Sequence, residues 1–575
     1  MIWKALLLYR LKKIRVQWQK YLNADLKDIL SQAKVSLQLS LLALVFALMA
    51  SAVIILFRLL LQWINTYTQT SELDFTEVID DWRVLLPLIG SVLIWIVARM
   101  TSKRYKRMGI AYVLHRVKLH YGKLPLQTAP SQFFQALFAL SANFSVGLEG
   151  PVIHLGAVTA SVMAEKFKLP DNSVRIICSS GIAAGIAATF NTPLAAVIFV
   201  FEVILREYKA HYFLPIIIAA ICGTVSSQLV FGNVHEYEQI GIIDIPLSQY
   251  PILAICGVIL GCVAALFNAS LLKVTATGQH WPLIYRLLLA GVITTIVGLL
   301  IPEALGSGQL TITQAIHEHP SIVFLIALLV CKMIATIAAI GLAVPGGMIG
   351  PLYGIGALVG AILALASAVF FPSITPYIGF YTIIGMITVM GVCLSAPLAA
   401  LVALLEMTNN PSIILPAMFV SIPAFLVANK AFNTTSLLLR QLDIMGLGYK
   451  VSAVKLALQK IGVRALMDKR MVIVTDNNEL LLEVLKRAEG RSVLVRNGLG
   501  MMEMLQLEMQ LSDKDSSLTR HPIKGLPDTA TLNEAYDILS PKRRGEVYIY
   551  QEHRDNVVGV VSWAALQKEI RSGQD

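Results

Sequence analysis

The sequence has few charged residues, and this scarcity is the first constraint on the kind of protein that it encodes. Only 14% of its 575 residues are Asp, Glu, Lys or Arg, whereas 56% are hydrophobic. A soluble globular domain usually carries about 25% charged residues. The mean hydropathy is +0.68. This composition excludes an ordinary soluble protein and predicts an α-helical polytopic membrane protein.

Cysteine is also scarce. The six cysteines are scattered, nearly all within apolar runs, at Cys178, Cys222, Cys256, Cys262, Cys331 and Cys393. Metal sites and disulfide frameworks use closely spaced or regularly repeated cysteines, and neither pattern occurs here. We therefore expect no metal centre, and we interpret the cysteines as small apolar side chains.

Acidic residues are missing from the N-terminal segment Met1–Tyr21, which contains Lys4, Arg10, Lys12, Lys13, Arg15 and Lys20. A second basic cluster, Lys103–Arg107, follows an apolar run. The formal net charge of +11 is thus concentrated beside membrane segments, where basic residues mark the cytoplasmic side. This placement argues against a nucleic acid partner and for the lipid bilayer. Because a signal-peptide cleavage pattern is lacking, we predict a basic amphipathic cytoplasmic segment over residues 1–35.

Long apolar runs occupy residues 36–445, but glycine and proline interrupt several of them. The breaks are Ser141–Pro151, Asn191–Pro193, Pro345–Pro351 and Ser395–Pro397. A straight helix needs about 20 residues to cross ~30 Å of hydrocarbon, and some of these pieces are too short. Broken helices at membrane depth are tolerated only where they are buried or line a cavity. The breaks therefore predict the position of a transport site.

The two halves of this region share a weak repeat. Gly147–Pro151 has a counterpart in Gly346–Pro351. Phe190–Ala196, followed by Glu202, has a counterpart in Leu394–Ala400, followed by Glu406. Paired broken helices in two similar halves predict an inverted-repeat transporter whose helix ends meet near the middle of the membrane.

Glu149 is an acid inside a long apolar tract, between Gly147 and Gly150 and before Pro151. Proline suits the first turn of a helix, and the glycines allow a ligand to come close to the backbone. A helix start attracts anions, so a carboxylate on the same turn would compete with a bound anion. Burial disfavours the charged form, and we expect Glu149 to take up a proton when no anion is present. The alternative is a capping residue at the membrane interface.

From residue 446 to residue 575, charges become frequent and apolar runs shorten to strand length. We predict strands at 471–474, 492–495, 547–550 and 557–561, and helices at 480–488 and 531–539. These segments indicate a soluble α/β domain on the cytoplasmic side.

The two Gly-rich motifs, Asn191–Ala196 and the Leu-Glu-Met-Thr sequence at Leu405–Thr408 together resemble the CLC family of chloride channels and chloride/proton antiporters. The similarity covers Leu37 to Leu442, and the tail resembles the paired CBS module of many CLC proteins. The resemblance implies a transporter rather than an enzyme, in the inner membrane of a bacterium, with both termini cytoplasmic. It implies a homodimer with a separate pathway for chloride or another halide in each subunit, gated by Glu149. The implied anion-binding residues are Met108, Gly109, Ile110, Gly147, Leu148, Gly150, Gly347, Met348, Ile349 and Leu438.

Several of these positions depart from the family pattern. Met108 stands where the family usually has a serine whose hydroxyl binds the central anion, and Leu438 stands where it has a pore tyrosine. Ile349 replaces a phenylalanine. We therefore expect a central site that relies on backbone N–H groups, is more apolar, and binds anions differently.

The implied proton pathway is altered as well. Antiporters of the family often carry a second Glu directly after the position of Glu202, and this chain has Val203 there, with Glu207 further on. The main prediction is chloride transport that is channel-like or weakly coupled to protons. The alternatives are a chloride/proton antiporter, a fluoride-selective exporter of the same family, and a non-transporting sensor that uses the tail. Met348, where the fluoride branch usually has asparagine, argues against the fluoride alternative.

Three further features carry expectations. Ser562 and Ala565 replace the Thr-x-x-Asp end of nucleotide-binding CBS units, so we expect no cofactor, with an adenine nucleotide as the alternative. The tail would then serve dimer contact and modulation of gating. We expect His154 to be a packed residue. We expect Lys332 to extend its amine to the membrane interface, with ion binding as the alternative.

Overall fold

The computed structural model describes residues 26–32, 36–68, 82–232, 245–317, 321–449, 452–475, 481–488, 490–497, 501–509 and 516–572. Of the predicted N-terminal amphipathic segment 1–35, only residues 26–32 lie inside these ranges, and the basic residues between Lys4 and Lys20 lie outside them. By its internal contacts the chain divides into two units. One comprises Ser40–Met163 and Arg175–Tyr449, and the other comprises Met1–Leu39, Ala164–Val174 and Lys450–Asp575.

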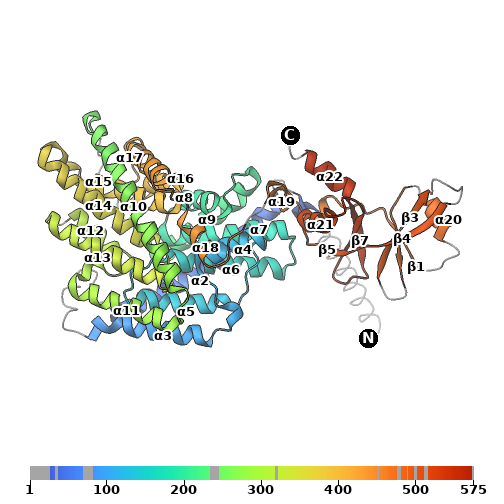
Figure 1. Ribbon diagram of the computed structural model, residues 1–575, viewed down its shortest axis with the longest axis horizontal. Helices are drawn as coiled ribbons and strands as arrows, with labels where there is room; N and C mark the ends of the chain where they lie inside the picture. The colour runs from blue at the N-terminus through green and yellow to red at the C-terminus, as the bar shows by residue number, and fades with distance from the viewer. Residues whose placement is uncertain are drawn as a thin grey trace, which may run out of the picture. The chain divides into compact units, whose positions relative to one another are not determined.

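The first unit is built from helices (Figure 1). In the described residues, ten helical segments are long and apolar enough to cross a membrane, which confirms the predicted polytopic α-helical class. The long helices are α2 (Leu37–Thr68), α3 (Leu86–Met100), α7 (Asp171–Phe190), α9 (Ala210–Phe231), α10 (Tyr250–Gly278), α11 (Leu283–Leu300), α13 (Ile322–Gly341), α14 (Ile349–Phe370), α15 (Ile378–Leu394) and α17 (Ile414–Leu426). The others are α4 (Gly109–Leu119), α5 (Thr128–Ser141), α6 (Glu149–Lys166), α8 (Pro193–Phe199), α12 (Gln309–His317), α16 (Pro397–Thr408) and α18 (Leu437–Ile444).

The helix breaks lie where glycine and proline predict them. Helix α5 ends before the first Gly-rich motif and α6 begins inside it, while α13 and α14 flank the second motif in the same way. Helices α8 and α16 both begin at the proline of a Pro-Leu-Ala-Ala sequence. Each lacks the length to span the membrane, although α8 continues as one π-helical turn over Val200–Leu205.

The repeat extends to the way the helices cross. Helices α6 and α7 meet at Gly156 and Gly181, and α14 and α15 meet at Gly356 and Gly385. At each of these glycines an added Cβ would overlap a backbone carbonyl oxygen of the other helix. Small residues allow membrane helices to approach this closely. The two halves therefore hold their Gly-initiated helices by the same device.

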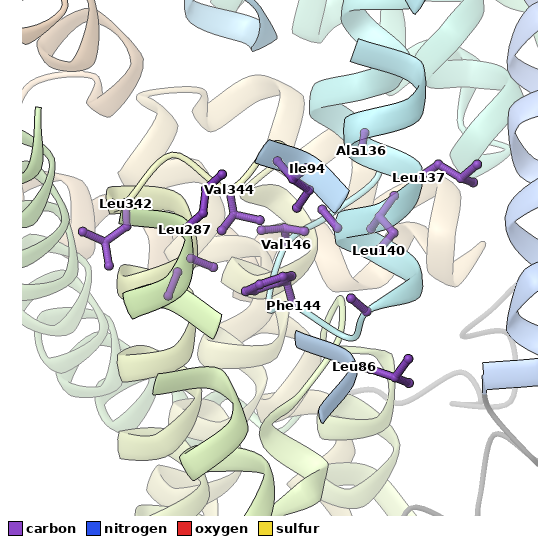
Figure 2. Close-up of a cluster of buried hydrophobic side chains, with 14 of the residues drawn as sticks. Leu86, Ile94, Ala136, Leu137, Leu140, Phe144, Val146, Leu287, Leu342 and Val344 are labelled. Atoms are coloured by element: carbon purple, nitrogen blue, oxygen red, sulfur yellow. The ribbon is translucent and has the colours of Figure 1, made fainter. Parts of the chain in front are cut away.

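An apolar cluster supports the segments that lead into the Gly-rich motifs. Figure 2 shows side chains from distant parts of the chain converging on Phe144 and Val146. Both residues are fully buried, and Val344 lies in the same cluster. Cores of this kind are close-packed, so the backbone just before each motif has a fixed position.

The second unit is an α/β region with two mixed sheets. One has the order β1-β2-β3-β4 (Val472–Thr475, Val493–Arg496, Met502–Met509, Ser516–Pro522), and the other has β5-β6-β7 (Gly525–Pro527, Glu546–Tyr550, Val557–Ser562). The helices are α19 (Ala453–Leu458), α20 (Leu481–Arg487), α21 (Leu532–Leu539) and α22 (Trp563–Ser572). This mixed topology is that expected of a CBS pair. The predicted strands and helices are present, whereas β3, β4 and β5 were not predicted.

Within this unit, three separate stretches of chain are held together by buried ion pairs and hydrogen bonds. Asp528 bonds both Lys27 Nζ (3.0 Å) and Arg464 Nη1 (2.9 Å), and all three side chains are buried or nearly so. Asn172 Nδ2 (3.0 Å) and Ser173 Oγ (2.8 Å) donate to the carbonyl oxygen of Leu30. The segment 26–32 thereby contacts both the tail and the residues that connect α6 to α7.

Asp28, the acid of the segment 26–32, makes this contact sensitive to pH. Burial raises the pKa of Asp28, but hydrogen bonds and charges from Lys469 and Arg464 outweigh burial and hold the pKa below its ordinary value. A carboxylate with a lowered pKa contributes stability above its unfolded-state pKa and loses it as the pH falls through the lowered value. We therefore expect the contact to weaken only in acid.

Substitution of Asp528 by Asn should loosen this three-part contact. It would remove the carboxylate that pairs with Lys27 and would leave Arg464 paired with Asp28 alone. Removal of one partner of a buried ion pair costs about 3–5 kcal/mol. The measurement is hydrogen–deuterium exchange of peptides covering 26–32 and 528–539 in the purified full chain. The control is Asp537→Asn, which breaks an exposed pair with Lys455 and should cost about 1 kcal/mol or less. Equal exchange in the two variants would contradict the expectation.

Candidate anion site

The two Gly-rich helix starts are joined directly, although they lie far apart in the sequence. Gly147 N donates to Gly347 O at 2.8 Å, and Gly347 N donates to Gly147 O at 2.7 Å. This two-residue antiparallel bridge places the beginnings of α6 and α14 side by side. At Gly150 an added Cβ would lie 2.6 Å from the carbonyl oxygen of Gly346, so the approach requires glycine.

The side chain of Glu149 fills the space between the two motifs. It is only 2% exposed, and its Oε1 accepts a hydrogen bond from Gly350 N at 2.9 Å. An added Cβ at either Gly147 or Gly347 would overlap the other carboxyl oxygen, Oε2. The carboxylate thus sits at the N-terminus of α14, where free N–H groups and the helix dipole favour negative charge. The carboxylate therefore lies where the sequence predicts an anion to bind.

The neighbours of the two motifs are largely apolar. Met348 and Ile349 are buried at the start of α14, and Leu148 is partly buried against the apolar cluster around Phe144. Since none of these side chains carries a polar group, polar contacts to an anion in this region come from the backbone. The predicted residues Gly147, Leu148, Gly150, Gly347, Met348 and Ile349 are therefore all brought to one place.

A third helix start, that of α4, already has a side-chain partner. Gly109 N donates to Gln132 Oε1 at 3.1 Å, and Gln135 Nε2 lies 3.9 Å from Met108 Sδ as a donor. Both glutamines are buried, being 1% and 3% exposed. An amide oxygen thus takes the backbone N–H of Gly109 that the resemblance assigns to the anion. Met108 and Ile110 flank this position.

Gln132 and Gln135 were not singled out in the sequence. They belong to a polar face of α5 that also includes Thr128 and Ser131, at helical spacings of three and four residues. Gln135 Nε2 donates to Ser131 Oγ at 2.7 Å, and Thr128 Oγ1 lies 2.9 Å from Nε2 of buried His154. A polar stripe on one face of an otherwise apolar membrane helix is the signal that would have revealed them.

Leu438 lies at the start of α18 and is buried. Helix α18 packs against α4 and α10. The structure therefore groups the altered positions Met108 and Leu438 on neighbouring helices.

Glu202 and Glu406 cap each other's helices. Glu202 accepts from Leu398 N (3.2 Å) and Ala399 N (2.7 Å) at the start of α16. Glu406 accepts from Leu194 N (2.8 Å) and Ala195 N (2.7 Å) at the start of α8. Each carboxylate satisfies two of the N–H groups that a helix start leaves free. The repeat seen in the sequence is thus an exchange of caps between the two halves.

Val203 and Glu207 lie beside this pair. Val203 is buried in the π-helical turn that follows α8. Glu207 Oε1 bonds Arg175 Nη2 at 3.2 Å and Lys118 Nζ at 3.5 Å, and Lys118 also donates to the carbonyl oxygen of Leu205. Glu207 is therefore part of a largely buried ion group, not an isolated surface acid.

The reciprocal caps lead to a symmetric prediction. Glu202→Ala and Glu406→Ala should each destabilise the protein by about 1–2 kcal/mol, since each removes a helix cap. Thermal unfolding of the purified protein measures this effect. The conservative variants Glu202→Gln and Glu406→Gln should both leave proton movement in transport assays near the wild-type level. Loss of proton movement in Glu202→Gln alone would instead give Glu202 a place in the proton pathway.

The expectation for Lys332 is wrong. Its side chain is 0% exposed, and Nζ donates to the carbonyl oxygens of Ala304 (3.0 Å), Leu305 (3.2 Å) and Gly306 (2.9 Å). The turn at 304–306 brings three carbonyl groups within reach, so the amine is satisfied inside the protein and does not extend to the interface.

Comparisons with known proteins agree with this geometry. Residues 89–429 match the family model described as voltage gated chloride channel. The H(+)/Cl(-) exchange transporter ClcA of Salmonella paratyphi A (strain ATCC 9150 / SARB42) is 30% identical over 310 residues, which span 52% of this chain and 65% of the relative.

Solved structures show the same fold. A slow cyanobacterial Cl-/H+ antiporter aligns with a TM-score of 0.62 and 22% identity over 72% of this chain and 99% of that chain. A CLC-type fluoride/proton antiporter gives 0.60 and 21% over 70% and 97%. A eukaryotic CLC transporter gives 0.59 and 17% over 92% and 97%. With a family match over more than half of its length, this chain belongs to the CLC family, whose model is described as voltage gated chloride channel.

Proposed function

We propose that the protein moves chloride across the membrane in weakly coupled exchange for protons, with Glu149 as the gate. The observation that carries the proposal is the carboxylate of Glu149 held by Gly350 N at the start of α14. The relatives named as H(+)/Cl(-) exchangers favour exchange over the channel-like reading of the sequence. Val203, which offers no acid at its position, is the reason to expect weak coupling.

The Glu149 carboxylate and a chloride ion compete for one position, the N–H groups at the start of α14, which we call the seat. The ionised carboxylate binds the partial positive charge at the helix start and excludes an anion. Protonation removes the negative charge, so the side chain loses this attraction and chloride can replace it. Partial charges from backbone N–H groups hold the anion without a full counter-charge, which keeps binding weak enough for release.

Flux measurements in proteoliposomes test the proposal. A chloride gradient should drive protons uphill, as followed with a pH electrode while chloride is measured in parallel. Chloride flux without proton movement would favour the channel-like alternative. Absence of any anion flux from correctly folded protein would favour a non-transporting sensor.

Fluoride export is the second candidate. Met108 and Leu438 carry no side-chain hydroxyl at the two positions where chloride-binding members of the family usually have one. The fold is similar to that of a CLC-type fluoride/proton antiporter. Fluoride efflux much faster than chloride efflux from the same vesicles would favour this candidate.

The assembly and location follow from the family resemblance. We propose a homodimer in a bacterial inner membrane, with both termini cytoplasmic and the tail acting as a CBS pair in dimer contact and modulation of gating. Ser562 Oγ accepts a hydrogen bond from Ala565 N at 3.2 Å and so caps α22. Ala565 has no carboxylate that could bind a nucleotide ribose. Unchanged melting of the full chain on addition of ATP would support a tail without nucleotide.

A further inference from the structure

Lys332 is a buried cation whose role the gate does not explain. It lies in the middle of the apolar helix α13, and its ammonium group donates to three carbonyl oxygens. Among the described residues it forms no ion pair with a carboxylate. Carbonyl groups satisfy its hydrogen bonds, but they carry no net charge. In its protonated form the amine therefore lacks a carboxylate partner among these residues, in surroundings where an isolated charge is costly.

The turn that holds this ammonium group packs on the anion site. Gly306 N donates to Asn143 O at 3.1 Å, in the segment that leads into the first Gly-rich motif. An added Cβ at Gly308 would lie 2.8 Å from Gly350 O, and one at Gly350 would lie 2.7 Å from Ser307 O. Gly350 is the residue whose N–H binds Glu149. The carbonyls bound by Lys332 thus belong to the same turn that is pressed against the seat of the carboxylate.

The lysine side chain also reaches α14 itself. Its Cε lies 3.5 Å from the Cβ position of Gly354, one helical turn beyond Gly350. One turn of helix is ~5.4 Å long, which places the ammonium group on the order of 10 Å from the seat of the carboxylate. Salt screens a buried charge much less than an exposed one. A second polar contact, between Thr336 Oγ1 and Ser145 Oγ at 2.8 Å, ties the same face of α13 to the first motif.

We propose that Lys332 is a positioning residue of the anion site that also supplies a full positive charge near it. Its charge would favour whichever anion occupies the seat, chloride or the Glu149 carboxylate, and its hydrogen bonds would hold residues 304–306 against α14. The proposal rests on the anion transport proposed above. If the role of Lys332 is purely structural, chloride affinity depends on its hydrogen bonds alone. This proposal predicts that chloride affinity also depends on its charge.

Matched substitutions separate charge from hydrogen bonding. Lys332→Gln keeps N–H donors without charge, and Lys332→Arg keeps both. We would place each in the Glu149→Gln background, so that no carboxylate competes for the seat, and titrate purified full chain with chloride by calorimetry. The expected dissociation constant rises about tenfold in Lys332→Gln and stays within about twofold in Lys332→Arg.

The outcomes separate the role of the Lys332 charge from the anion transport on which it rests. Equal chloride affinity in Lys332→Gln and its parent would overturn the role of the charge, and so would an Arg variant as weak as the Gln variant. Failure of the Glu149→Gln parent itself to bind chloride would instead overturn the proposed function. If Lys332→Gln does not fold, Lys332→His provides a charge that acid switches on. Its chloride affinity should be higher at pH 5.5 than at pH 8, relative to the Lys parent, and an equal ratio would contradict the proposal.

Discussion

Glu149→Gln should give chloride flux that no longer depends on pH, with proton movement reduced at least tenfold. Gln has nearly the shape of Glu but no negative charge, so the N-terminus of α14 holds it more weakly. Charge-assisted hydrogen bonds are about twice as strong as neutral ones, and the favourable interaction with the helix dipole is lost as well. The seat would then be open to anions at every pH. Chloride efflux from proteoliposomes between pH 5 and pH 8, with a pH electrode, measures both quantities.

A matched control shows that the effect belongs to this position. Glu483, an exposed acid of α20 paired with Arg487, can be changed to Gln without touching the transport helices. We expect Glu483→Gln to transport as the wild type does. Wild-type rate and wild-type pH dependence in Glu149→Gln would exclude Glu149 as the gate.

Gly147→Ala should displace the Glu149 side chain without changing any ionisable group. The nearest atoms to an added Cβ at Gly147 all belong to the carboxyl group of Glu149. Since this group is the end of a flexible side chain, it can move while the backbone stays in place. We expect a folded protein whose chloride flux has lost most of its pH dependence, as in Glu149→Gln. Flux measurements on both variants under the same conditions provide the comparison.

Two other glycines sharpen this test. Gly347→Ala would also approach backbone atoms, 2.7 Å from Gly150 N and 3.0 Å from Glu149 N, so we expect it to impair folding. Gly278→Ala would meet one tight contact, 3.3 Å from Leu342 Cδ2, which is the end of a flexible side chain, and should be tolerated. Gly147→Ala and Glu149→Gln act through the same carboxylate. The double variant should therefore lose little more of the pH dependence of chloride flux than Glu149→Gln alone. Full additivity would mean that Gly147 acts by another route.

The sequence was most informative where backbone chemistry is unusual. Glycine and proline located the starts of α6, α8, α14 and α16, because few other residues permit such close approach or favour a first turn. Short apolar runs of strand length located β6 and β7. By contrast β4, with the sequence SSLTRHP, has too few apolar residues to be recognised as a strand. It is a strand because its backbone pairs with β3.

Contacts between distant residues could not be predicted in the same way. Glu202 and Glu406 appeared in the repeat as equivalent acids, but only the three-dimensional arrangement shows that each caps the helix of the other half. Lys332 looked like an interfacial lysine because its carbonyl partners come from a turn with no charged or unusual side chain. Gln132 was overlooked because a neutral amide gives little signal in an apolar helix.

The most direct test of the central claim is the location of bromide, a heavy halide, in structures of the wild type and of Glu149→Gln. The account predicts an anomalous bromide peak within hydrogen-bond distance of Gly350 N in Glu149→Gln. In the wild type at neutral pH, the Glu149 carboxylate should occupy that place. A Glu149→Gln structure with no halide at the start of α14, or a wild-type structure with halide there beside an undisplaced Glu149, would contradict competition for one seat.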